Sequence, residues 1–225
     1  MGTIVRRGPL VSAIAIAALA ISADPALAQA PETFSVSSEE PEPVNSAPPA
    51  EPEESDLVED PDPEPLPTGT GLPGKPGDTT NGPYCGPTTR IYTPNSKGGT
   101  YHKGVGPTNS NYNGTSRTAR STFTSEVTGE VGVSVTSGLT TSVDAMIAKI
   151  EAKYEVNLSA KLTAKLGNSI SVDTPPRKTT NAKYGVYRLK NTGTSYIMYS
   201  NCKTSTKKTI TSYTPMRVGW YLWEE

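Results

Sequence analysis

Two neighbouring stretches of the chain alternate apolar and polar residues, and this pattern constrains the fold more than any other feature. The apolar residues fall on odd positions from Phe123 to Val143 and on even positions from Met146 to Val172. Each alternation extends over more than twenty residues, whereas an ordinary β-strand has about 5–6 residues. The pattern therefore predicts one very long antiparallel hairpin, whose arms at 121–140 and 155–173 lie side by side.

Each arm of this hairpin is expected to have one covered apolar face and one exposed polar face. A register slip of one residue would reverse every such assignment on an arm. Thr136 and Lys161 are expected on the exposed face. The apolar face is expected to carry Val131, Val133, Val135, Ile150, Tyr154, Val156, Leu158 and Leu162.

The connection between the arms has the features of a short helix. Thr141 and Ser142 precede the segment 144–154, which begins with an acidic residue and is rich in Ala, Lys and Glu. This order is typical of a helix N-cap and first turn. We expect a helix from about Val143 to Lys153. A helical and a non-helical connection both bring the two arms together, so the hairpin is predicted in either case.

The rest of the domain is expected to complete an elongated antiparallel sheet, which gives a mainly β fold class. Turn-forming residues are dense from Gly82 to Gly114, which predicts short strands and loops. The run Asp173–Pro176 ends the second arm of the hairpin. Shorter strands are then expected at Lys183–Lys190, Tyr196–Ser200, Lys208–Tyr213 and Trp220–Trp223.

Charge divides the chain into two blocks. Residues 29–74 contain twelve acidic residues and no Lys or Arg, whereas residues 75–225 contain nineteen Lys and Arg against nine acidic residues. Repeated proline and mutually repelling carboxylates prevent the acidic block from burying enough apolar surface to fold. We therefore expect a disordered acidic Pro/Glu-rich arm at 29–80 and a single β-rich domain at 81–225.

The acidic arm has three interpretations. It is a semi-rigid spacer, a peptide that docks on a partner protein, or a segment that folds back onto its own basic domain. Under the docking interpretation its apolar anchors are Phe34, Leu57, Val58 and Leu66.

The first 28 residues have the three parts of an export signal. Arg6 and Arg7 precede an apolar stretch at 9–22, and Ala26 and Ala28 give a small-x-small cleavage pattern. A membrane-spanning helix needs about 20 apolar residues, so the stretch is too short for an anchor. The sequence predicts a signal peptide at 1–28 and a secreted, extracellular protein, exported by the general or the twin-arginine route.

Export determines how the two cysteines are interpreted. Outside the cell thiols oxidise, and Cys85 and Cys202 allow only one intramolecular pairing. We therefore expect a structural disulfide between them. A metal site and a thiol nucleophile are the alternatives, but two cysteines and one histidine make a poor set of metal ligands.

The domain has no pattern of residues typical of an enzyme. His102 is the only histidine and has no carboxylate near it in sequence, so it is predicted to be a surface residue in a Gly-rich, Tyr-rich loop. The sparse acidic residues and the glycine spacing match no metal-binding or nucleotide-binding motif. We expect no enzymatic activity and no cofactor. Lysines are spread along the strands, so no nucleic-acid partner is expected.

The Thr/Ser-rich arms, the amphipathic segment between them and the break at 171–176 resemble the pore-forming module of the aerolysin-like toxin family, over about residues 115–200. That resemblance implies a hairpin that each subunit inserts into a membrane. A membrane β-strand needs about 9–11 alternating residues, and these arms have more. The charged segment 144–155 departs from the family, and the chain shows no receptor-binding head.

The layout of the chain also resembles small secreted actinobacterial proteins that end in segments like 184–187, 201–202 and 218–220. By layout alone it is similar to the adaptor subunit of streptomycete umbrella toxin particles, which joins a lectin-bearing subunit to a toxin-bearing one. No residue motif carries a site across from that adaptor.

Three functions follow as expectations. The first is a secreted, non-enzymatic adaptor or accessory component of an exported antibacterial toxin assembly, which binds protein partners through its acidic arm and its β domain. The second is an aerolysin-like β-pore-forming protein, for which a membrane is also a partner. The third is a structural protein of the cell wall or spore surface.

Overall fold

The computed structural model describes residues 44–51, 57–59 and 84–225, all of which belong to one compact unit at Glu39–Glu225. The predicted signal peptide and most of the predicted arm, with Phe34 and Leu66, lie outside the described residues. The fold class is confirmed, because the described chain is mainly β with antiparallel pairing and one short helix.

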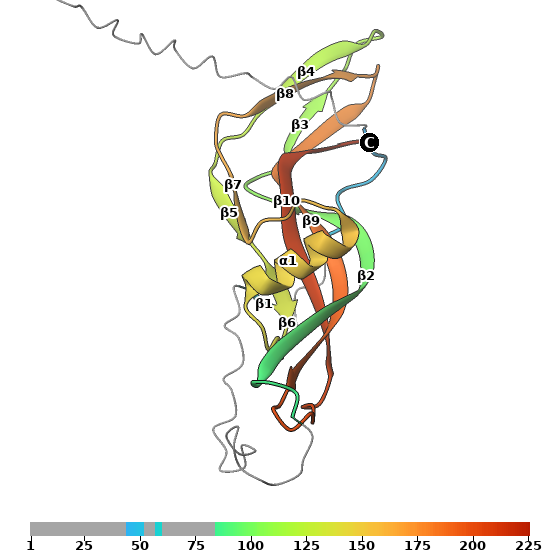
Figure 1. Ribbon diagram of the computed structural model, residues 1–225. Helices are drawn as coiled ribbons and strands as arrows, with labels where there is room; N and C mark the ends of the chain where they lie inside the picture. Colours follow the sequence, from blue (N-terminus) through green and yellow to red (C-terminus); the bar gives the residue numbers. More distant parts are fainter. Residues whose placement is uncertain (1–43, 52–56, 60–83) are drawn as a thin grey trace, which may run out of the picture. The chain divides into compact units, whose positions relative to one another are not determined.

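The main sheet is built on three long strands, which run side by side in Figure 1. They are β2 (Thr89–Gly104), β9 (Thr179–Met198) and β10 (Lys208–Glu224). The sheet has the order β1-β6-β10-β9-β2, with β1 at Leu57–Glu59 and β6 at Ser134–Thr136. The short strand β3 (Asn109–Tyr112) pairs with β9 beyond the end of β2.

The prediction of several short strands in the segments of β9 and β10 is wrong. β9 joins two predicted strands through Asn191–Ser195, whose residue types are common in turns. Position 193 requires a glycine, because a side chain there would collide with the ring of Tyr92. β10 likewise joins two predicted strands across Pro215, because the register shifts between Pro215 and Arg217 and a β-bulge tolerates a proline.

Residues 119–174, the insert, leave the main sheet and return to it. Strand β4 (Ala119–Thr124) pairs with β8 (Ser169–Thr174), and β5 (Gly129–Gly132) pairs with β7 (Lys161–Ala164). Both pairs share one register, which steps evenly from Ala119↔Thr174 to Gly132↔Lys161. These paired strands form a two-stranded ribbon, so antiparallel arms are confirmed over this range.

The arms separate beyond the ribbon. Instead of continuing to residue 140, the first arm contributes β6 to the main sheet, where Val135 pairs with Ser212 of β10. The expected helix is confirmed as α1 (Val143–Tyr154), whose first turn is capped by the Ser142 side chain accepting a hydrogen bond from the backbone N–H of Ala145. The second arm does not begin until Lys161, and the break after Thr174 is as predicted.

The insert covers both faces of the main sheet. Along β9, Tyr184 and Val186 belong to one buried cluster, whereas Leu189 belongs to a second. Successive side chains of a strand point to opposite faces, so the change from even to odd positions places the clusters on opposite sides. The ribbon packs on the first face through Phe123, Val131 and Ile170. On the second face, Met146 and Ile150 of α1 pack in one cluster with Val135 of β6 and the preceding Val133.

The predicted disulfide is confirmed. Cys85 and Cys202 are bonded, with their Cα atoms 5.1 Å apart and a sequence separation of 117. The bond joins the chain just before β2 to the loop between β9 and β10. The loop that it closes contains the whole insert and excludes the acidic arm.

Candidate functional site

Two short pieces of the acidic arm contact the main sheet. The Asn45 N–H donates to the carbonyl of Leu222, and the Glu224 N–H donates to the carbonyl of Asn45, each over 2.9 Å. The Glu51 carboxylate lies 3.0 Å from the ammonium of Lys183. Leu57–Glu59 then forms β1, so the expectation of a disordered arm does not hold there. Of the three interpretations of the arm, these contacts match the one in which it folds back.

The Glu51 contact lies on a part of the sheet that we name the arm face. Lys183 and Leu189 both occupy odd positions on β9, so their side chains lie on the same face of the sheet. Leu189 packs in the cluster under α1, so the arm face belongs to the face opposite the ribbon, beyond the part that α1 covers. Three rows of residues cross it from strand to strand. The rows are His102–Tyr187–Arg217, Gly104–Gly185–Gly219 and Lys183–Tyr221.

The middle row consists of glycines because the flanking groups occupy the space above it. A side chain at Gly185 would collide with the backbone oxygen of Lys103 and lie 2.9 Å from the His102 ring. A side chain at Gly219 would lie 3.2 Å from the ring of Tyr187. The glycine row therefore lets aromatic rings lie close to the backbone of the sheet.

The outer rows combine aromatic rings with cations. The Arg217 guanidinium lies 4.1 Å from the ring centroid of Tyr187, and the ring of His102 meets Tyr187 edge to face at 4.8 Å. Tyr187 is fixed by its hydroxyl, which donates to the carbonyl of Trp220 over 2.8 Å. Cations stacked on aromatic rings present flat apolar surface and positive charge together, a combination that suits an acidic, proline-rich chain.

His102 is not the surface histidine that the sequence predicts. It lies within β2 and is only 2 % exposed. Burial lowers the pKa of His102 to about 4, against the smaller opposing effect of the hydrogen bond between its Nε2 and the Gly219 carbonyl. The imidazole is therefore neutral at neutral pH and acts as a packing group between Tyr187 and Tyr221.

One motif in the sequence marks this surface and was missed. Lys183-x-Gly185-x-Tyr187 and Arg217-x-Gly219-x-Tyr221 have the same pattern of cation, glycine and tyrosine. Because β9 and β10 are antiparallel and their glycines pair, each cation lies opposite the tyrosine of the other strand. A search for a repeated motif with period-two spacing would have found it.

The ribbon is amphipathic. Its sheet-facing side chains include Phe123, Val131 and Ile170, and its outward side carries Ser, Thr and charged residues such as Thr122, Glu130 and Lys161. Glu130 lies across from Thr163, and it forms an exposed ion pair at 2.8 Å with Lys161, its diagonal neighbour on the other strand. Apolar and polar faces are therefore separated along the paired strands.

The residues predicted for the apolar face of the hairpin do not share one site. Val131 and Leu162 pack in the cluster under the ribbon, and the other six pack in the cluster under α1. Thr136, predicted to be exposed, is half-buried and accepts a hydrogen bond from the Thr211 N–H over 3.0 Å. Lys161 is exposed, as predicted. Of the predicted arm anchors, Leu57 is half-buried and Val58 is exposed in β1.

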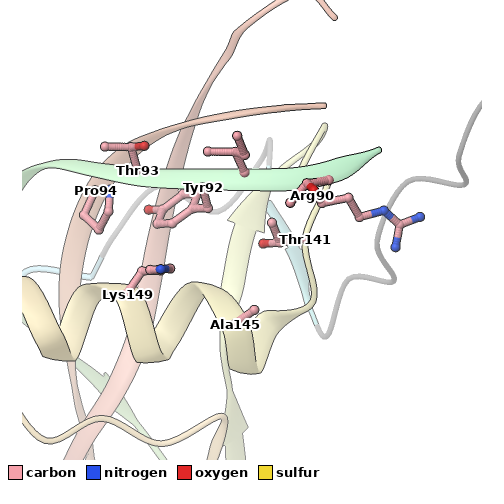
Figure 2. A pocket seen from close by; sticks show the side chains of 9 residues that line it. Arg90, Tyr92, Thr93, Pro94, Thr141, Ala145 and Lys149 are labelled. Atoms are coloured by element: carbon pink, nitrogen blue, oxygen red, sulfur yellow. The ribbon is translucent and has the colours of Figure 1, made fainter. Parts of the chain in front are cut away.

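A cavity of about 410 Å³ lies between β2 and α1 (Figure 2). Figure 2 shows Tyr92 and Lys149 pointing into it from the two elements. The Tyr92 hydroxyl donates to the Asn191 side chain over 2.8 Å, and burial raises the pKa of Tyr92 to about 12. Tyr92 is therefore already bonded within the protein and neutral, so its hydroxyl is not prepared for acid–base chemistry.

Within the described ranges no three His, Cys, Asp or Glu side chains lie close enough together to bind a metal ion. No helix in that part of the chain is long and apolar enough to cross a membrane. No protein-family model matches the chain, and no curated protein matches its sequence.

Proposed function

We propose that this protein is a secreted, non-enzymatic interaction component of an exported antibacterial assembly, and that its arm face binds acidic, extended protein segments. The observation that carries the proposal is the paired cation-glycine-tyrosine motif of β9 and β10, with the acidic Glu51 bound to its Lys183. An adaptor needs a surface that binds a partner, and the arm face offers cations and aromatic rings for this purpose.

Three physical features support this function. Tyrosine and arginine are enriched at protein interfaces because each adds a large rigid contact area at little entropic cost. The glycine row lets the rings of His102 and Tyr187 lie against the backbone of the sheet, which fixes the aromatic surface on which Arg217 stacks. The basic excess of residues 75–225 attracts acidic chains at long range.

The disulfide between Cys85 and Cys202 supports the extracellular part of the proposal, because such bonds persist in oxidising environments. The apolar stretch and cleavage pattern of the first 28 residues supply the route. The resemblance in layout to an adaptor subunit suggests an exported assembly as the setting.

The test is a pull-down from culture supernatant with three forms of the full chain. We expect the native protein to capture a defined partner and the charge-reversal variant Arg217→Glu to lose it. Lys149→Glu, which makes the same change on the exposed side of α1, is the matched control and should retain the partner. Capture of no partner by any form, or equal capture by all three, would contradict the adaptor function.

A β-pore-forming function is the second candidate, and the ribbon favours it. Its single register, with an apolar face towards the sheet and a Ser/Thr-rich face outward, is the arrangement that a membrane-inserted hairpin requires. Under this function the ribbon detaches from the sheet and inserts. Dye release from anionic and neutral liposomes tests it, and leakage with SDS-resistant oligomers would place it above the adaptor function.

A further inference from the structure

β6 lies next to the end of the main sheet, and only β1 covers its outer edge among the described strands. β6 pairs with β10 along its inner edge, through Val135↔Ser212 and Ser134↔Tyr213. Along its outer edge it pairs with β1, through the three positions Leu57↔Thr136, Val58↔Val135 and Glu59↔Ser134. The terminal strand of the sheet thus comes from the acidic arm.

β6 is held firmly from its inner side. Val133 and Val135 have no exposed surface, and both pack in the cluster under α1. Ser134 is also fully buried, and its hydroxyl accepts a hydrogen bond from the Arg188 guanidinium over 3.0 Å. The Thr211 N–H donates to the Thr136 hydroxyl. β6 therefore does not depend on β1 for its position, and its outer edge is preformed.

β1 is held weakly by comparison. It has only three residues, Leu57 is half-buried, and Val58 is 46 % exposed. A strand of this length buries little apolar surface, so most of its attachment comes from backbone hydrogen bonds, each of which contributes about 0.5–1.5 kcal/mol. A firm edge covered by a weakly held strand is a site at which one strand can replace another.

We infer that the outer edge of β6 is a strand-docking site for an extended acidic segment of a partner protein, and that β1 occupies this site within the chain until the partner displaces it. The inference rests on the proposed interaction function and names the kind of partner. Chain-to-chain pairing at a sheet edge supplies the binding energy, and side chains at alternate positions supply the selectivity.

The contacts of the arm define the chemistry of that partner. Its strand runs antiparallel to β6, with an apolar residue at the place of the half-buried Leu57. The residue at the place of Val58 faces solvent and is unrestricted. A further carboxylate at the position of Glu51 binds Lys183 on the arm face, so strand pairing and charge recognition lie on one continuous segment.

The arm lowers the apparent affinity of this site for any other chain. A tethered strand competes at an effective concentration in about the millimolar range, so a partner meets only the fraction of molecules whose site is open. A variant whose arm cannot form β1 should therefore bind a free peptide more tightly than the native chain does.

The experiment uses the full chain and a fluorescent peptide with the sequence of residues 44–59. The variant Leu57→Pro/Val58→Pro removes the backbone N–H of both residues. Successive N–H groups of a strand point to opposite edges, so one of the two removed N–H groups is a donor that faces β6. The control Leu57→Thr/Val58→Thr keeps both donors. By fluorescence anisotropy we expect the proline variant to bind the peptide at least tenfold more tightly than the native chain and the threonine variant.

Hydrogen exchange of residues 134–136 provides a second measurement that does not depend on affinity. Exchange should be faster in the proline variant than in the native chain, and the peptide should restore protection. Equal peptide affinity of the native and proline forms, equal binding of a scrambled peptide of the same composition, or unchanged exchange would each overturn the inference.

The same samples distinguish a partner protein from a second copy of the chain as the occupant of the site. They also distinguish failure of this inference from failure of the proposed function. If the native chain forms dimers in sedimentation and the proline variant does not, the occupant is the arm of a second copy and the inference of a separate partner is overturned. The peptide titration needs no natural partner, so tight binding with an empty pull-down would contradict the proposed adaptor function alone.

Discussion

The insert and the acidic arm both cover the main sheet, but they are held by different forces. The insert contributes large apolar side chains to two buried clusters, and it follows one register over the whole ribbon. The described arm residues contribute one backbone bridge, a side-chain hydrogen bond from Asn45 to the Leu222 carbonyl, one ion pair with an exposed carboxylate, and a three-residue strand. Under the proposed interaction function the insert is a fixed part of the fold, whereas the arm is a cover that can leave.

The difference follows from how much each contact stabilises. Burial of a Val, Leu, Ile, Phe or Met side chain contributes about 1.5–3 kcal/mol, and the insert buries several. An exposed ion pair contributes about 0–1 kcal/mol because water and salt screen it. Mutations in the insert should therefore lower the stability of the domain, while mutations in the arm should change its attachment without unfolding the domain.

Loss of the disulfide should have the largest effect, and it tests which region the bond serves. The closed loop of 117 residues contains the insert and not the arm. The loop-entropy model gives about 5 kcal/mol for a loop of this length. Reduction, or Cys85→Ser/Cys202→Ser, should lower the midpoint of thermal unfolding strongly without changing the affinity of the chain for the arm peptide. Two free thiols in the secreted protein would refute the bond itself.

Placing a charge in the insert should have the next largest effect. Val133 has no exposed surface, so Val133→Lys buries an unpaired ammonium and should lower the free energy of unfolding by about 3–5 kcal/mol. Thr163→Lys is the matched control, because Thr163 is exposed on the ribbon and its replacement should change stability by less than about 0.5 kcal/mol. Equal urea midpoints for the two variants would mean that the insert is not packed on the sheet.

Lowering the pH should lower the free energy of unfolding through His102. Its pKa is about 4 in the folded protein, against 6.5 for an ordinary histidine. Above pH 6.5 the imidazole is neutral in both states; as the pH falls towards 4, the unfolded state gains the proton first, so stability is lost in this window. The loss approaches about 3 kcal/mol. The variant His102→Gln should lack this component in urea titrations between pH 4 and 7, and identical slopes would contradict it.

The glycine row should tolerate side chains unequally. Gly185→Ala places a methyl group against the backbone oxygen of Lys103, which cannot move freely, so we expect a loss of about 1–3 kcal/mol in unfolding free energy. Gly219→Ala meets only the edge of the Tyr187 ring at 3.2 Å and should lose less than about 1 kcal/mol. If thermal melts show the two variants to be equal, the row is not closely packed.

Local patterns in the sequence predicted the local structures well. The alternation around Val131 and Leu162 predicted two antiparallel arms, and Ser142 with the acid after it predicted α1 and its N-cap. The paired cysteines predicted the disulfide. In each case the residues that decide the structure are close in sequence, or only one pairing exists.

Long-range packing explains what the sequence did not predict. Turn-type residues at 191–195 became part of a long strand because strands on both sides pair with them. The bulge beside Pro215 shifts the side-chain parity of β10, so one alternation does not show which residues before and after the bulge share a face. His102 is buried only because β2 lies beside β9 and Gly185 leaves room for its ring.

The smallest expected effect compares two exposed ion pairs, one in each region. Glu51→Gln removes the contact with Lys183 in the arm, and Glu130→Gln removes the contact with Lys161 in the ribbon. Both should change the free energy of unfolding by less than about 1 kcal/mol, because both carboxylates are largely exposed.

Hydrogen exchange should separate them where stability does not. In Glu51→Gln the backbone amide of Asn45 should exchange faster, because Asn45 and Glu51 belong to the same described piece of the arm. In Glu130→Gln the amides of β5 should exchange as before, because Val131 remains buried under the ribbon. Faster exchange in both variants would show that the ribbon also depends on surface charge, and the distinction between a fixed insert and a removable arm would then fail.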